Sequence, residues 1–504
     1  MVETRKWKDA HGVSFEQDEN GITLVGATRA LVPESYEIPK GVTKIGKKAF
    51  QSCKRIKNVV IPDSVTEIGE NAFQRCKNLT DLVIPDSVTT IGEGAFSRCE
   101  GLIELKIPES VTEIKLRVFN GCTNLTSVSI PNSVTKIGKE AFLFCENLAS
   151  VIIPDSVTEI EEGAFSDCKK LKSATLSHSL TEIGKKVFGF CKELSNVTIP
   201  NSVRKIGPGS FGFCQNLTNV TIPDSVTEID GAFYDSGITN VMIPNSVTKI
   251  GRATFLRCKN LKSITIPDSV TDLDGIQLFM DCENLTSVAL PNSLTEIGNR
   301  MFACCKNLTS ITMPDSVTKI DTEAFAGCEA LASVDIPNSV TEIGECAFLC
   351  CSNLTSVTMA DSVVEIKNYA FDYCKKLSKL TLSNSIAKIG EGAFWNCEKL
   401  ASVIIPTSVE EIGDYAFKNC EDLKLVILSK STNVGNFAFN DDVAISWFDE
   451  KVFSSMSINE LEKEIETLNQ QICDLCKEQE YERASQLREK RIKLEKVLEA
   501  KRQE

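Results

Sequence analysis

The apolar positions of this chain repeat with a period of 23 residues. Each unit reads close to the stretch from Ile61 to Cys76, IPDSVTEIGENAFQRC. Neither a helical nor a strand period runs through a whole unit, so each unit must contain more than one short element. The alternation in LxxLxI predicts a short strand, SVTxI predicts a second extended segment, and the spacing in AFxxC predicts one helical turn.

About 18 such units follow one another, the last of them truncated. One unit cannot bury its own apolar face, whereas stacked units cover one another. We therefore predict a repeat solenoid over residues 39–440, β-rich with short helical turns. Residues 1–38 hold two apolar runs around Glu19-Asn20-Gly21, which predicts a β-hairpin cap. Residues 441–457 are expected to form the C-terminal cap and a linker.

The sequence changes character after residue 457. Ile458, Leu461, Ile465 and Leu468 alternate spacings of three and four, which is typical of a heptad stripe on a long helix. Residues 458–482 carry a net charge of -6 and residues 483–504 a net charge of +4. Opposite charges on two helical arms favour an antiparallel α-helical hairpin or coiled coil over residues 458–504. Such a hairpin could recruit a partner protein or self-associate.

Composition excludes several function classes. The net charge of -14 and the pI near 5.0 argue against nucleic acid as the main partner, because phosphate neutralisation requires clustered Lys and Arg. No stretch of 18 apolar residues occurs, so we expect no membrane span. The first 21 residues lack the apolar segment of a signal peptide, which predicts a cytoplasmic location. Export to the cell surface by a nonstandard route is the alternative.

The 21 cysteines follow the repeat. Sixteen of them lie three residues after the Phe of a unit, where they could pack in the core, form disulfides between coils, or react. Unpaired Cys is among the most often buried residue types, so we predict reduced thiols packed in the interior. Cys304, Cys346 and Cys350 break the column. Cys473 and Cys476 form a lone CxxC, a weak pattern for a metal site.

Catalytic chemistry finds no support in the sequence. His11 and His178 are the only histidines, and neither GxSxG nor the phosphate-binding pattern GxxxxGK[ST] occurs. The serine after each Pro-Asp or Pro-Asn step is expected to satisfy backbone groups where the chain turns. We predict a protein that is not an enzyme and has no catalytic, cofactor-binding or metal site.

A binding surface is predicted on the strand that ends each unit. If this strand lines a concave sheet, the residues between its apolar positions face outward; they are small and polar, so they form either an extended weak platform or a solvated sheet. The unit from 223 to 244 is two residues shorter than the 23-residue period, and the unit from 267 to 291 is one residue longer than it. These irregular units mark a bend or a site around Phe233, Tyr234 and Met242, or are tolerated deletions and insertions. The candidate protein-binding residues are Asn196, Thr198, Asn219, Thr221, Asn240, Met242, Ser263 and Thr265.

The repeat itself resembles a known family. LxxLxI followed by PDSVTxIGxxAFxxC is similar to the BspA-like class of leucine-rich repeat, over about residues 39–440. The resemblance implies a curved β-rich solenoid with roles in adhesion and protein binding, often at cell surfaces.

The C-terminal region carries a second resemblance. EYERASQLRE, from Glu480 to Glu489, resembles the UVR motif of the UvrB and UvrC repair proteins and of some Clp-type ATPases. Tyr481 stands where Phe is usual, and Glu489 where Asp is usual. The resemblance implies a protein-contact module, with Tyr481, Ala484, Leu487 and Arg488 as its contact residues.

Together these patterns predict a non-catalytic scaffold for protein–protein interaction, with the solenoid surface as ligand platform and the C-terminal hairpin as recruitment or dimerisation module. A secreted or surface adhesin, and an accessory factor to UvrB/UvrC-type or Clp-type machinery, are the alternatives.

Overall fold

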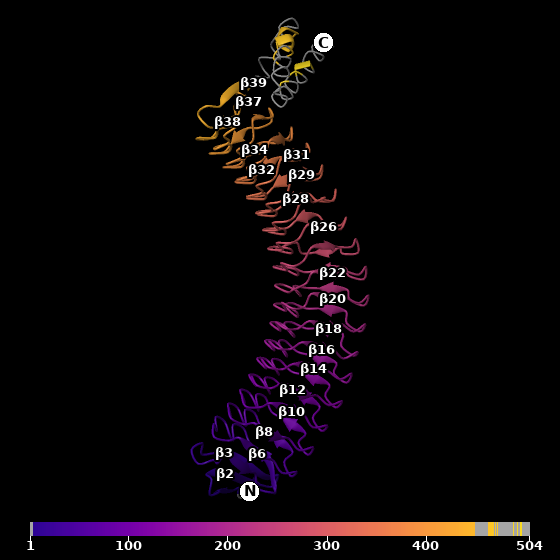
Figure 1. Cartoon of the computed structure of the whole chain (residues 1–504), viewed down its shortest axis with the longest axis vertical. Coiled ribbons are helices and arrows are strands. Elements are labelled where there is room, and N and C mark those ends of the chain that lie inside the picture. The colour runs from indigo at the N-terminus through magenta and orange to yellow at the C-terminus, as the bar shows by residue number, and fades with distance from the viewer. Residues whose placement is uncertain are drawn as a thin grey trace. The chain divides into compact units, whose positions relative to one another are not determined.

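A computed structural model describes residues 4–448 together with residues 462–467, 469, 471, 487, 491, 494 and 495. The chain divides into two compact units, Met1–Leu273 and Asp274–Glu504. The boundary between them falls inside the repeat that is one residue longer than the rest. Within residues 4–448 each unit is built of β-solenoid coils, about 19 turns in all, which confirms the predicted fold class for this part of the chain (Figure 1).

The N-terminal end of the first unit is a three-stranded cap. Strands β1 (Arg5–Lys8), β2 (Val13–Asp18) and β3 (Gly21–Ala27) pair antiparallel in that order. Strand β3 then pairs parallel with β5 (Val42–Ile45) of the first coil. The cap therefore occupies the backbone groups on the outer side of β5, and β1 becomes the edge strand of this sheet.

One side of each coil in the first unit is a short strand whose outer residues are exposed and whose central residue points inward. The hydrogen-bonded neighbours pair parallel, and Figure 1 shows β10 to β22 as successive rungs. We call these strands the long row: β4 (Ser35–Glu37), β6 (Asn58–Val60), β8 (Asp81–Val83), β10 (Glu104–Lys106), β12 (Ser127–Ser129), β14 (Ser150–Ile152), β16 (Ser173–Thr175), β18 (Asn196–Thr198), β20 (Asn219–Thr221), β22 (Asn240–Met242) and β24 (Ser263–Thr265).

A second side carries mostly two-residue strands, and in most of them a buried Ile follows a charged residue. After β5 this short row comprises β7 (Glu67–Ile68), β9 (Thr90–Ile91), β11 (Glu113–Ile114), β13 (Lys136–Ile137), β15 (Glu159–Ile160), β17 (Glu182–Ile183), β19 (Lys205–Ile206), β21 (Glu228–Ile229), β23 (Lys249–Ile250) and β25 (Asp272–Leu273).

The third side consists of turns, and the predicted helical turn at AFxxC is wrong: residues 4–448 contain no helix. In the second coil, Asn71 and Arg75 have φ of 54° and 62°, a left-handed conformation that ends helical propagation. Alternate N–H groups of this coil instead donate to carbonyls of the next one, from Asn71, Phe73 and Arg75 to Glu93, Ala95 and Ser97 at 2.8, 2.7 and 2.8 Å. The spacing of buried Phe and Cys suits a helical turn and these consecutive turns alike.

The interior of the first unit is built from columns of identical residues. Buried Phe rings stack from coil to coil, with centroids 5.1–6.0 Å apart from Phe50 to Phe255. Each column Cys is buried, and from Cys76 onward each donates its S–H to the carbonyl of a Phe in the preceding coil, as Cys76 does to Phe50 at 3.0 Å. The predicted interior packing of the cysteine column is confirmed.

The serines also act as predicted, since the Ser87 hydroxyl donates to the Val65 carbonyl at 2.8 Å. This bond satisfies a backbone oxygen where the chain turns. Ser64, Ser133, Ser156, Ser225 and Ser269 make the equivalent bond, whereas the buried hydroxyls of Ser202 and Ser246 have no partner among the described residues.

The second unit has the same two rows. Its long row contains β26 (Ser287–Ala289), β29 (Ser333–Ile336), β31 (Ser356–Met359), β33 (Lys379–Thr381), β35 (Ser402–Ile404), β37 (Leu425–Ser429) and β39 (Ala444–Phe448). Its short row contains β27 (Glu296–Ile297), β28 (Lys319–Ile320), β30 (Glu342–Ile343), β32 (Glu365–Ile366), β34 (Lys388–Ile389), β36 (Glu411–Ile412) and β38 (Asn433–Val434).

Beyond β39 the structure describes short helical pieces. Residues 462–467 are helical, and Ile465, Leu487 and Leu494 are buried. Arg491 donates to the side-chain oxygen of Asn469 at 3.0 Å. The greater part of the predicted 458–504 hairpin lies outside the described residues, and so do Cys473 and Cys476.

Candidate functional site

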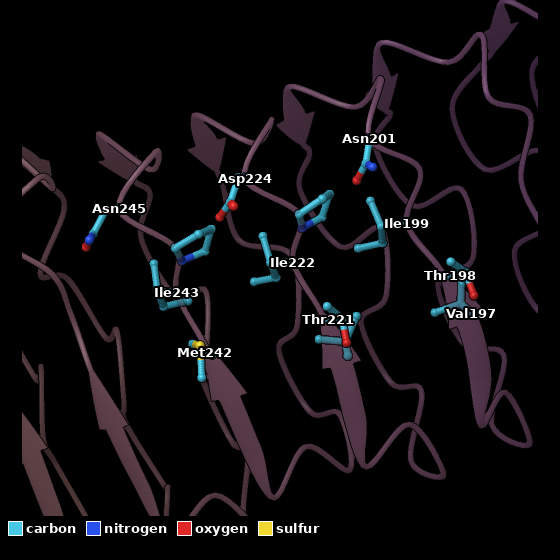
Figure 2. A pocket seen from close by; sticks show the side chains of 13 residues that line it. Val197, Thr198, Ile199, Asn201, Thr221, Ile222, Asp224, Met242, Ile243 and Asn245 are labelled. Carbon is cyan, nitrogen blue, oxygen red and sulfur yellow. The ribbon is translucent and has the colours of Figure 1, made fainter.

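A shallow groove of about 830 Å³ runs along three coils of the first unit. Three parallel rows of side chains line it, as Figure 2 shows. Thr198, Thr221 and Met242 end the strands β18, β20 and β22; Ile199, Ile222 and Ile243 follow them; and Asn201, Asp224 and Asn245 form the far rim.

The backbone places the first of these rows. In β18, β20 and β22 the outer residues are exposed and the central Val is buried, because successive side chains of a strand point to opposite faces. Strands β20 and β22 pair with Asn219 opposite Asn240 and Thr221 opposite Met242. The Met242 side chain is 83% exposed, the largest exposed fraction among the large apolar side chains described as exposed.

The shortened repeat keeps this register intact. Its two missing residues lie on the turn side, one before Phe233 and one after Ser236. Gly237 occupies the shortened turn after Ser236, where the backbones approach so closely that an added Cβ would lie only 2.0 Å from the Gln215 carbonyl oxygen. Because the turns absorb both deletions, the long row continues unbroken through β20 and β22.

The structure gathers only some of the predicted site residues. Thr198, Thr221 and Met242 line the groove, whereas Asn196, Asn219 and Asn240 are exposed at the other end of the same strands. Ser263 and Thr265 are exposed on β24 outside the lining.

Of the residues around the shortened repeat, Phe233 is buried and Tyr234 is half-buried, and neither lines the groove. Phe233 lies in the interior ladder, and Tyr234 packs edge-on against Phe213, with centroids 5.3 Å apart. Of this trio only Met242 reaches the groove.

Sequence reasoning missed two of the three rows that line the groove: the row of Ile199, Ile222 and Ile243, and the rim of Asn201, Asp224 and Asn245. Each of their residues occupies a fixed offset in the Ile-Pro-Asp or Ile-Pro-Asn step, so aligning the units would have found them. Of the residues predicted in the C-terminal segment, Leu487 is helical and buried, and Tyr481, Ala484 and Arg488 lie outside the described residues.

Comparison with known proteins identifies the repeat. The BspA type leucine rich repeat region matches residues 33–145, 112–231, 230–354 and 318–446. The chain belongs to this family. No curated protein matches the chain.

Solved structures of leucine-rich repeat proteins are similar to this BspA-type protein. One from Bacteroides ovatus ATCC 8483 is 26% identical, covers 89% of this chain and 99% of its own, and superposes with a TM-score of 0.57. A leucine rich cell surface protein from Faecalibacterium prausnitzii A2-165 is also 26% identical, covers 89% and 95%, and has a TM-score of 0.30. The protein TpLRR of T. pallidum is 26% identical over 42% of this chain and 90% of its own, with a TM-score of 0.31.

Burial in the cysteine column of this BspA-type protein lowers the reactivity of the thiols. Burial raises the pKa of the Cys53 thiol to about 11 and that of Cys76 to about 12, so both stay protonated near neutrality. Cys304 and Cys346 are half-buried and Cys350 is exposed. Among the described residues no cluster of metal-ligating side chains occurs. In the same part of the chain, no helical segment has the length and apolar character of a membrane span.

Proposed function

We propose that this chain is a non-catalytic scaffold whose groove along β18, β20 and β22 binds another protein. The observation that carries the proposal is Met242, an exposed, flexible apolar side chain beside a row of small threonines and asparagines. Methionine adapts to varied partner surfaces because it is unbranched and polarisable. The groove contains no charged residue besides Asp224, so a partner loses little solvation of charge when it docks.

A stable interface buries about 800 Å² on each partner, so a partner would have to contact more of the long row than the three coils that form the groove. The long row extends it, because Ile152 of β14 occupies the same slot as Met242 and is 69% exposed. A partner that lies along the row from β14 to β22 would therefore meet an apolar side chain at each end, with small polar residues between them.

We also propose that residues 458–504 recruit a second protein or a second copy of the chain. The heptad pattern, the opposite charges of the two arms and the UVR-like core support this role. The hydrogen bond between Arg491 and Asn469 agrees with a fold-back of the two arms. An accessory role beside UvrB/UvrC-type or Clp-type proteins rests on the same core.

A photo-crosslinking residue placed at Thr221 in the full chain tests the groove. We expect a specific crosslinked protein from this position and none from Ser129, which holds the same slot in β12. Purified partner should then lose affinity for Met242→Asp and keep it for Val83→Asp, a change in the same slot of β8. Equal crosslinking at Thr221 and Ser129 would contradict the proposal.

Light scattering on the full chain and on a chain ending at residue 457 tests the C-terminal segment. A dimer that becomes a monomer on truncation supports self-association, and affinity capture with the two chains separates a recruited partner from one bound by the solenoid. The cytoplasmic location stays a prediction: resistance to external protease in intact cells supports it, and cleavage favours the adhesin alternative.

A further inference from the structure

Six cationic side chains of the first unit line one pocket of about 750 Å³ on the turn side of the first coils. The chain as a whole carries a net charge of -14, so this concentration of positive charge is local. Ala30 and Ser52 complete the lining, and it contains no aromatic residue. We call this site the basic pocket; its cations are Arg29, Lys54, Arg55, Arg75, Lys77 and Arg98.

The backbone holds two of these arginines in register. Arg75 and Arg98 both precede the column Cys of their coils, with φ of 62° and 60°. Their N–H groups donate to carbonyls of the following coils at 2.8 and 2.6 Å. Equivalent positions of adjacent coils lie about 5 Å apart. Gly121 takes this position in the next coil, so the row of cations ends there.

Two other arginines are anchored by the backbone. Arg29 donates from Nε to the Gln51 carbonyl at 2.9 Å, and Arg55 donates from Nη1 to the Ala30 carbonyl at 3.2 Å. A guanidinium has five N–H groups, so each retains donors for a ligand. Both side chains are thus oriented before any ligand arrives.

Carboxylates neutralise only the margin of the basic pocket. Glu100 pairs with Lys77 at 2.7 Å. Glu34 pairs with Lys57 at 2.9 Å, and the Lys57 ammonium, with a smaller contribution from the charge of Arg55, lowers the Glu34 pKa. Among the described residues no carboxylate pairs with Lys54, Arg75 or Arg98. Like charges on side chains of adjacent coils repel, and an anion placed between them removes that repulsion.

We propose that the basic pocket binds a compact ligand bearing two or more phosphate or sulfate groups. Arginine matches these groups with paired hydrogen bonds, and the row of cations spans only two or three coils. The acidic remainder of the chain repels a long polyanion. Single-stranded nucleic acid is disfavoured, since its binding relies on aromatic platforms that the pocket lacks.

Calorimetric titration of the full chain tests this proposal with two probes, inorganic tripolyphosphate and a heparin-derived tetrasaccharide. We expect saturable binding of at least one probe at about 50 mM salt, weakened by added salt because screening is stronger. The tighter probe tells whether phosphate or sulfate is the natural group. The double variant Arg75→Ala/Arg98→Ala should bind at least about tenfold more weakly, since two charge-assisted contacts are lost.

Lys170→Ala/Lys192→Ala is the matched control, because it removes two exposed cations from coils outside the pocket and should bind as the unmodified chain does. Thermal melts establish that both double variants are folded. A single-stranded oligonucleotide is titrated in the same way as a comparison. Unchanged binding by the arginine variant, no binding of either probe, or tighter binding of the oligonucleotide than of both probes would overturn the proposal.

Discussion

Two adjacent cysteines belong to two different regions of the molecule: Cys351 lies in an interior column, and Cys350 lies on the turn surface beside it. Cys351 is fully buried and donates to the Phe325 carbonyl at 3.2 Å, whereas Cys350 is exposed. The interior position is Cys in nearly every coil. The neighbouring surface position is occupied in turn by residues as different as Arg98, Gly121 and Phe144.

The difference between these two positions indicates which residues of the repeat can vary, and therefore which can acquire a binding function. Each interior side chain contacts its equivalents in the coils before and after it, so a change there disturbs two neighbours. The surface position has its backbone fixed by hydrogen bonds between coils, and in most coils its side chain is partly or fully exposed, with the buried Asn396 as an exception. Side chains of different charge and shape can therefore replace one another at the surface position without loss of the fold. The arginines of the basic pocket are an example.

Alkaline pH should give the largest effect, because it acts on the whole interior column at once. A thiol in the unfolded chain has its ordinary pKa of 9.0, and burial raises the pKa of Cys76 to about 12. Below pH 9 both states are protonated and stability does not depend on these groups. Above it only the unfolded state loses protons, so stability falls by up to about 1.4 kcal/mol per thiol for each pH unit.

Urea unfolding at pH 7 and at about pH 10 measures this loss. The triple variant Cys99→Ser/Cys122→Ser/Cys145→Ser should lose stability less steeply between the two pH values, because three of the raised thiols are gone. An identical pH dependence for the variant and the unmodified chain would show that the interior column does not cause it.

Removal of one interior ring should give the next largest effect. The Phe142 ring stacks between Phe119 and Phe165 at 5.4 and 5.1 Å. Phe142→Ala should lower the free energy of unfolding by about 3–5 kcal/mol, since it leaves a cavity in the ladder. Phe144→Ala, two residues along and 43% exposed, should cost less than about 1 kcal/mol. Similar losses for both variants would erase the distinction between interior and surface.

A smaller effect is expected where a turn is closed by glycine. Gly237→Ala would place a Cβ 2.0 Å from the Gln215 carbonyl oxygen and should destabilise the chain by about 1–3 kcal/mol. Gly26→Ala is the control, because no atom lies within 4 Å of the point that its added Cβ would occupy. Differential scanning calorimetry compares the two variants; equal melting temperatures would mean that the shortened coil relaxes freely.

The sequence predicted the interior better than the turns. Burial repeats at every coil, so the Phe, Cys and Ser columns and the two strand rows could be read from one period. The turns could not, because left-handed residues such as Asn71 and the hydrogen bonds between coils leave no hydrophobic pattern of their own. The predicted helix in AFxxC failed for this reason.

The candidate sites divide in the same way. Thr198, Thr221 and Met242 were predicted because strand alternation fixes which residues face outward. The basic pocket was missed, since Arg29 comes from the cap and Arg75 and Arg98 come from different coils. Only the folded chain places these three arginines around one pocket, although Arg75 and Arg98 share one offset in the repeat.

Thiol labelling of the native chain, with each site mapped by mass spectrometry, tests the division into interior and surface most directly. One residue type occupies both regions, so differences in intrinsic reactivity between residue types do not enter. We expect Cys350 to be labelled at neutral pH, and Cys76, Cys99 and Cys351 to react only after denaturant unfolds the coils. Labelling of the column cysteines in the folded chain at the rate of Cys350 would contradict the account.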